Sequence, residues 1–121
     1  MRQTLYTQME LKKPEIKSWD CVDHDPIDEW APEDRENVDF WFNVSIGIEG
    51  EASADNFQVH VVSESMLSRC TEKNYLIVIP YYESWDNIID AVKVKIESCT
   101  DVSWSGMAPQ IAKLFLWEYE S

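Results

Sequence analysis

The chain has 121 residues, 45 % of them hydrophobic, which predicts a single domain over residues 1–121 that buries about two thirds of the surface of its unfolded chain. Its 23 acidic and 10 basic residues give a formal net charge of −13, which disfavours nucleic acid and anionic membranes as partners and favours a basic protein. The three cysteines, an odd number with no close pair, argue against a disulfide framework or a zinc ribbon and predict reduced, buried thiols. The lack of a signal peptide or of a run of about 18 apolar residues indicates a cytoplasmic protein.

The N-terminal part of the chain predicts little regular structure before its first strand. Residues 1–10 carry no pattern, and we expect them to form a loose lead-in. The next stretch, residues 11–19, places Leu11, Ile16 and Trp19 among polar residues, and its Pro14 lacks the N–H that a central strand needs. We therefore expect an edge strand here.

An acidic segment follows, from Asp20 to Asp39. It contains nine acidic residues and one basic residue, Arg35, so its net charge is −8. Two prolines interrupt it and no apolar period runs through it, which predicts a surface loop. Its Trp30 is either a plug that packs against the sheet or an exposed anchor for a partner.

The stretch from Val38 to Val62 predicts a long antiparallel hairpin, around which the rest of the fold is built. Apolar residues alternate with polar ones in both halves, and a small polar stretch, residues 49–55, separates them. The same alternation places His60 on the outer face of the second strand, away from the core. The residues expected to face inward are Val38, Phe40, Phe42, Val44, Ile46, Ile48, Phe57, Val59 and Val61.

Two short elements are expected after the hairpin. Ser63 and Ser65 offer N-cap oxygens for a helical turn over residues 65–70, with Met66 and Leu67 pointing inward. The continuous apolar run at residues 75–79 is typical of a fully buried central strand.

The C-terminal third predicts two helices and a strand. A helix begins at Ser84, and its inward residues recur at helical spacing. A second helix begins at Ser103 or Ser105 and ends near Ala112, where Pro109 costs a backbone hydrogen bond unless it lies in the first turn. From residue 114 the alternation favours a last strand, although these residues also suit an extension of the helix. The inward residues of the first helix are Trp85, Ile88, Ile89, Val92 and Ile96.

Together these elements predict an α+β fold, with an antiparallel β-sheet of about five strands built on the central hairpin and two helices packed on one face. Over roughly residues 11–120 the chain resembles the immunity protein 8 family of bacterial polymorphic toxin and contact-dependent growth inhibition systems. The motifs that carry the resemblance are Ile46-Gly47, Asp55-Asn56-Phe57-Gln58-Val59, Ser65-Met66-Leu67, Ser103-Trp104 and Trp117-Glu118. The resemblance implies a protein that binds and neutralises a cognate toxin without catalysing a reaction, and it supplies no contact residues.

Catalytic and metal-binding patterns are weak in this sequence. Residues 21–25 offer a thiol, an imidazole and two carboxylates, but a metal site needs ligands that converge from fixed elements, and a short acidic loop is a poor match. Three glycines without a Gly-Lys-Ser/Thr signature disfavour a phosphate-binding loop. We therefore predict no enzymatic activity, no cofactor and no metal site.

The charge pattern suggests how a partner is bound. The acidic segment supplies the candidate contacts, joined by hairpin-turn and C-terminal acids (Glu49, Glu51, Asp55, Glu118 and Glu120), and a nuclease toxin would offer a basic cleft in which carboxylates replace phosphates. The alternatives are an acidic surface that serves only solubility, a nucleic-acid mimic or accessory protein that binds a host nucleic-acid-handling enzyme, and a small enzyme that uses Cys21 and His24. The candidate partner-binding residues are Asp23, Asp25, Asp28, Glu29, Trp30, Glu33 and Asp34.

Overall fold

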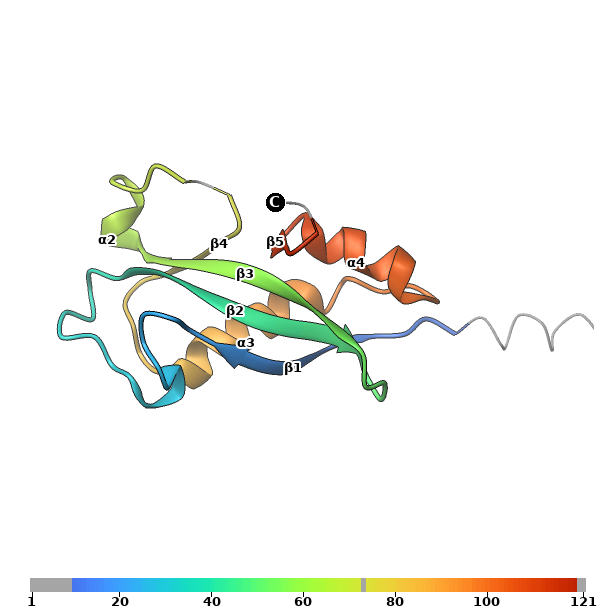
Figure 1. Ribbon diagram of the computed structural model, residues 1–121. Coiled ribbons are helices and arrows are strands. Elements are labelled where there is room, and N and C mark those ends of the chain that lie inside the picture. Colours follow the sequence, from blue (N-terminus) through green and yellow to red (C-terminus); the bar gives the residue numbers. More distant parts are fainter. Residues whose placement is uncertain (1–9, 73, 120–121) are drawn as a thin grey trace, which may run out of the picture.

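The computed structural model describes residues 10–72 and 74–119 and shows an α+β fold (Figure 1). The predicted lead-in lies outside the described residues, except for Glu10. The elements follow one another in the order β1 (Pro14–Asp20), the short 3-10 helix η1 (Ile27–Glu29), β2 (Asp39–Ile48), β3 (Ala54–Ser63), α2 (Glu64–Leu67), β4 (Leu76–Ile79), α3 (Trp85–Ile96), α4 (Trp104–Ala112) and β5 (Leu116–Trp117).

The predicted hairpin is confirmed as the centre of the sheet. β2 and β3 pair antiparallel, from Asp39 opposite Val62 at the open end to Gly47 opposite Ala54 at the turn. β1 pairs antiparallel with β2 as an edge strand, and its register shifts between Ile16 and Ser18. The short β5 pairs with β3 near the turn. The predicted class, a sheet of five strands with two packed helices, is therefore confirmed.

The prediction of a buried central strand at residues 75–79 is wrong. β4 lies at the edge of the sheet, pairs parallel with β3, and leaves Val78 44 % exposed. An apolar run of this length suits either position, because β-branched residues favour any pleated surface and pairing partners are not encoded locally.

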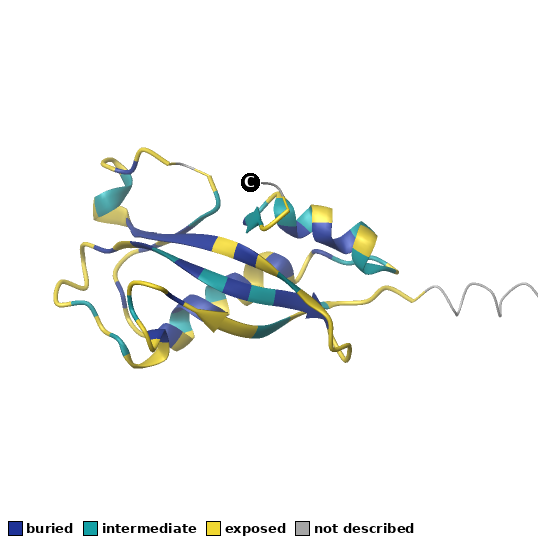
Figure 2. Ribbon diagram, in the orientation of Figure 1, coloured by how far each residue is buried: buried dark blue, intermediate teal, exposed yellow. Residues whose placement is uncertain are grey.

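One core lies between the sheet and the two longer helices. Alternate residues are buried along β2 as far as Ile46, which Figure 2 shows as alternating colours, whereas the last five residues of β3 are all buried. In α3, all five residues predicted to face inward are buried, and Ser84 caps the helix by accepting a hydrogen bond from the Asn87 N–H. In α4, Met107 and Ile111 join the same core.

The second helix begins where the sequence predicted, with Ser103 as the N-cap that accepts from the Gly106 N–H. It runs through Pro109, which lies beyond its first turn and so removes one helical hydrogen bond. Next to the proline, Gln110 Nε2 donates to the carbonyl oxygens of Gly106 and Thr100, at 3.1 and 2.8 Å. The helix is thus tied to the loop before it by a side chain that follows the proline.

The prediction that His60 lies on an exposed face is also wrong. Its side chain is only 3 % exposed, and the neighbouring Val62 and Ser63 are fully buried. α2 and the described residues that follow it, 68–72 and 74–75, lie over this end of the hairpin (Figure 1). Alternation assigns a residue to one side of a sheet, but whether that side is covered depends on distant segments.

The cysteines and the hairpin turn behave as the sequence predicts. The three cysteines are free and buried. Gly47 lies so close to the opposite strand that a Cβ there would be 2.1 Å from the Ser53 carbonyl oxygen, and Gly50 has a φ of +85°, so both positions favour glycine. Among residues 10–72 and 74–119, no helix combines the length and apolar character needed to cross a membrane.

Candidate functional site

The acidic loop, residues 20–39, runs from the end of β1 to the start of β2 and lies at the open end of the hairpin (Figure 1). The six candidate carboxylates on it are all exposed, whereas Trp30 is partly buried. The structure therefore gathers the candidates on one segment. The exposed carboxylates belong to Asp23, Asp25, Asp28, Glu29, Glu33 and Asp34.

The single basic residue of the acidic loop ties it to the segment before α3. Arg35 Nη1 donates to the carbonyl oxygens of Tyr82 and Glu83, at 3.0 and 2.9 Å. In return, the Tyr82 N–H donates to the Arg35 carbonyl oxygen at 2.7 Å. Among the described residues Arg35 forms no ion pair with a carboxylate, so its guanidinium serves to hold the loop backbone.

Short-range contacts fix the last part of the loop. The Asp34 carboxylate accepts from the Glu36 N–H at 3.1 Å and from Asn37 Nδ2 at 2.7 Å. Ser65 Oγ, on α2, donates to the Glu36 carbonyl oxygen and contacts Asn37 Oδ1. The loop is thereby held between α2 and the segment before α3.

Trp30 is part of a ring cluster that holds the middle of the loop. Its ring stacks on His24 at a centroid distance of 3.8 Å and meets Phe40 and Tyr82 edge-on at 5.3 and 5.4 Å. Cys21 Sγ donates to the Trp41 carbonyl oxygen at 3.3 Å. This packing matches the first alternative for Trp30, a side chain that packs against the sheet. A contact between Trp30 and a partner stays a prediction.

Two ionisable groups of this region have shifted pKa values. The Asn37 amide, followed by the Glu36 N–H, lowers the pKa of Asp34 because both donors stabilise the carboxylate. Burial raises the pKa of the Tyr82 phenol, and the nearby Arg35 opposes that shift. Asp34 therefore keeps its negative charge to lower pH than a free aspartate does.

The acids of the hairpin turn do not share a surface with the acidic loop. β2 has ten residues, so it separates its two ends by about 30 Å. Glu51 pairs with Lys12 at 2.9 Å, and Asp55 is occupied by two tryptophans. The expectation that these carboxylates join the loop in one patch is therefore wrong. Of the two C-terminal acids in that expectation, Glu120 lies outside the described residues.

Three of the motifs that carry the family resemblance meet at the turn end of the hairpin. Asp55 Oδ2 accepts from Trp104 Nε1 at 2.9 Å and from Trp117 Nε1 at 3.1 Å. Asn56 donates its N–H to Glu118 Oε1 and accepts from the Glu118 N–H, both at 3.0 Å. Together these four hydrogen bonds join α4 and β5 to the hairpin, so the motif residues hold the fold together.

Trp19 lies in a shallow groove between β1 and α3. The sequence predicts it only as a residue of the edge strand. Trp19 is 39 % exposed, and its ring meets Trp85 edge-on at 5.8 Å. The groove has a volume of about 370 Å³, and its rim carries both acidic and basic side chains. It is lined by Ile16, Trp19, Asp86, Ile89, Asp90 and Lys93.

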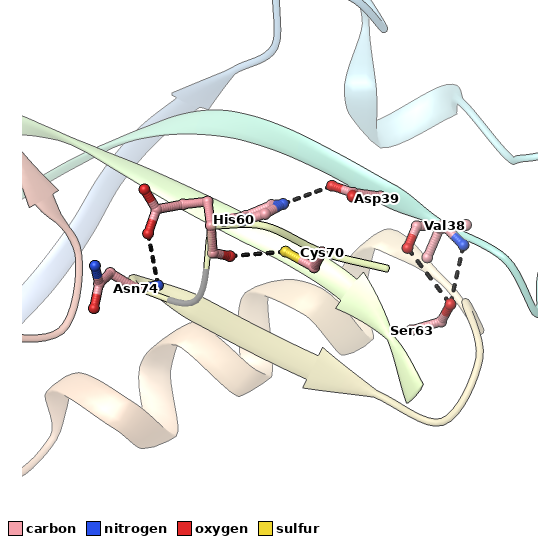
Figure 3. A network of polar contacts seen from close by, with 7 residues as sticks. Val38, Asp39, His60, Ser63, Cys70 and Asn74 are labelled. Atoms are coloured by element: carbon pink, nitrogen blue, oxygen red, sulfur yellow. Dashed lines mark hydrogen bonds and ion pairs between the residues drawn. The ribbon is translucent and has the colours of Figure 1, made fainter. Parts of the chain in front are cut away.

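A cluster of polar side chains includes Asp39, the last residue of the acidic loop (Figure 3). His60 Nε2 is 2.5 Å from Asp39 Oδ1, and the His60 ring stacks on Trp41 at a centroid distance of 4.4 Å. A His60 ring nitrogen, an Asp39 oxygen and Cys70 Sγ all lie within 4.8 Å of one another. Sequence reasoning missed this cluster because its members come from three segments. Residues 21–25 form no such group in the part of the chain that the structure describes.

In comparisons with known proteins, residues 14–121 match the family described as immunity protein 8. No curated protein and no solved structure matches the chain significantly. The family match spans every element of the structure, from β1 to β5.

Proposed function

The chain belongs to the immunity protein 8 family, and we propose that it neutralises its cognate toxin by binding a basic surface of that toxin with the acidic loop. Membership of this family implies a non-enzymatic protein that binds and neutralises a cognate toxin. The observation that carries the proposed interface is the set of six exposed carboxylates on one loop whose backbone is fixed by contacts to the rest of the fold.

Charge is the first support for this interface. Residues 20–39 contribute −8 of the net charge of −13. Their one basic residue, Arg35, donates to backbone carbonyl oxygens of the segment before α3. A dense field of one sign attracts an oppositely charged partner and raises the association rate toward about 10⁸–10⁹ M⁻¹s⁻¹ at low salt. A basic toxin is therefore the partner that the loop fits.

Preorganisation is the second support. Arg35, Asp34 and Ser65 hold the backbone of the loop, and Trp30 holds its middle. Because the loop is already ordered, binding loses less conformational entropy than it would with a flexible acidic segment. Carboxylates in fixed positions also discriminate among basic surfaces, since an arrangement that matches one set of lysines and arginines does not match others.

The toxin that this loop fits best is a nuclease delivered by a neighbouring cell. A nuclease carries lysines and arginines where the phosphates of its substrate lie, and an acidic inhibitor that fills this cleft blocks the substrate directly. A general nucleic-acid mimic would also be acidic, but it would bind unrelated basic nucleases, whereas an immunity protein distinguishes its own toxin from others.

The decisive experiment is co-expression of the full chain with the C-terminal domain of a toxin encoded beside it. We expect growth rescue, a co-purified complex, and an affinity that falls as salt rises, because the attraction is between charges. Co-purification with several unrelated basic nucleases would favour the nucleic-acid mimic. Failure to rescue growth or to form a complex would refute neutralisation of that toxin.

The position of the interface is tested by comparing two charge-reversal variants that have the same net charge. We expect Asp23→Lys, Asp28→Lys and Glu33→Lys together to weaken toxin binding by about tenfold or more, mainly through slower association. The control variant carries lysine at three exposed acids outside the loop, and it changes the net charge by the same amount. These control positions are Glu49, Glu64 and Glu97. Equal loss in both variants would mean that only the net charge matters, and that the loop is not the interface.

A further inference from the structure

We propose that Cys70, His60 and Asp39 form a binding site for a transition-metal ion of the zinc type. The three side chains come from the segment after α2, from β3 and from the first residue of β2, so they converge from separate segments of the chain. Their ligand atoms lie within 4.8 Å of one another (Figure 3). The site is separate from the proposed toxin contacts, although Asp39 is the last residue of the acidic loop.

Burial and hydrogen bonding distinguish this cluster from an ordinary group of surface acids. His60 is 3 % exposed and Cys70 is 6 % exposed. An ionised carboxylate only accepts, so the Nε2 that contacts Asp39 carries the imidazole proton. The other ring nitrogen, Nδ1, is buried without a hydrogen-bond partner among the described residues. A buried polar atom without a partner is costly, and coordination of a metal satisfies it.

The donor set selects the kind of ion. A thiolate and an imidazole suit Zn²⁺ or Co²⁺, whereas Mg²⁺ and Ca²⁺ require oxygen ligands. Tetrahedral zinc places its ligand atoms about 3.5 Å apart, so Cys70 Sγ, which lies within 4.8 Å of a His60 ring nitrogen, must approach the ring by up to roughly 1 Å. Cys70 lies outside the helices and strands, so this approach breaks no helix or strand hydrogen bond. Asp39, whose side chain is 35 % exposed, accepts the Nε2–H and so orients the His60 ring, which binds the ion through Nδ1 beside the Cys70 thiolate.

Binding exchanges protons for the metal. The Cys70 thiol donates to the Glu72 carbonyl oxygen at 2.7 Å and must lose its proton to become a ligand. Metal affinity should therefore fall as the pH is lowered, because protons compete for the thiolate and the imidazole. The bound ion would link the segment after α2 to the hairpin beside the acidic loop.

The test uses the tag-free full chain, stripped with a chelator and titrated with Co²⁺. We expect one Co²⁺ per chain, a sulfur-to-cobalt charge-transfer band in the near ultraviolet, displacement of the cobalt by Zn²⁺, and an increase in Tm of about 5 °C or more with excess Zn²⁺. Cys70→Ser and His60→Gln should each abolish the band and the Tm increase. Absence of the band in the unmutated chain would overturn the proposal.

Two further variants guard against misfolding and against binding elsewhere. Cys99→Ser removes a buried thiol that is not in the cluster and should keep the band, the stoichiometry and the Tm increase. Asp39→Asn changes a partly exposed residue and should weaken Co²⁺ binding about tenfold while the circular dichroism spectrum stays unchanged. A band that persists in Cys70→Ser, or one that is lost in Cys99→Ser, would also overturn the proposal.

Discussion

The two ends of the central hairpin hold a carboxylate in contrasting ways. At the turn end, Asp55 accepts two indole N–H groups, from Trp104 and Trp117. At the open end, Asp39 contacts a single imidazole, that of His60, with a cysteine thiol nearby. The Asp55 bonds join the hairpin to α4 and β5, whereas the Asp39–His60 contact joins the two strands of the hairpin to each other.

The difference lies in the chemistry of the donor. An indole always donates and does not titrate near neutral pH, so the joint at Asp55 is permanent while the fold persists. An imidazole can also bind a metal, and on the proposed metal site the joint at Asp39 is therefore exchangeable. Three family motifs converge on the permanent joint, and the acidic loop ends at the exchangeable one. The molecule thus places the family motifs at one end of the hairpin and the candidate binding surface at the other.

The largest expected effect is at the permanent joint. Asp55→Ala removes the acceptor of two partly buried indole N–H groups, and we expect the free energy of unfolding to fall by about 2–4 kcal/mol. The measurement is urea denaturation followed by tryptophan fluorescence. Glu49→Ala at the exposed hairpin turn is the matched control and should change stability by less than about 0.5 kcal/mol. Equal stability of the two variants would show that the Asp55 bonds do not hold the turn end together.

The elements that the sequence predicts well are those whose pattern is local. The helix after Ser84 repeats every three or four residues, and all its predicted inward residues are buried. The hairpin alternates over both strands, so its register follows from one buried face. β4 was misplaced because its short apolar run contains no information about which strand it pairs with, or in which direction.

The candidate site was predictable in composition and only partly in arrangement. The exposure of the acidic loop follows from its charges and prolines, and the separation of Asp55 from the loop follows from the length of β2. The cover over His60 does not follow from the sequence, because it is made by residues 64–72 and 74–75, whose packing is set by the whole fold. The bonds from Trp104 and Trp117 to Asp55 were equally invisible, since they connect residues 49 and 62 positions apart.

A smaller effect is expected at the open end, where Ser63 links β3 to the residue before β2. Ser63 Oγ accepts from the Val38 N–H at 3.0 Å, and both residues are buried. Ser63→Ala leaves that N–H without its side-chain acceptor, so we expect the free energy of unfolding to fall by about 1–2 kcal/mol in urea denaturation. Ser98→Ala, at an exposed position after α3, should be nearly neutral. A loss at Ser63 as large as that at Asp55 would remove the contrast between the two ends.

The smallest effect, and the sharpest comparison, comes from one substitution made at both ends in the presence of a chelator. Asn keeps an acceptor oxygen and removes the charge. Asp39→Asn should cost less than about 1 kcal/mol, because the side chain is 35 % exposed and makes one bond, whereas Asp55→Asn should cost more, because it weakens two charge-assisted bonds. Urea denaturation at pH 7 measures both. If Asp39→Asn lowers the free energy of unfolding more than Asp55→Asn does, the stronger joint lies at the open end, because a weakly held carboxylate cannot contribute more to stability than one bound by two indoles.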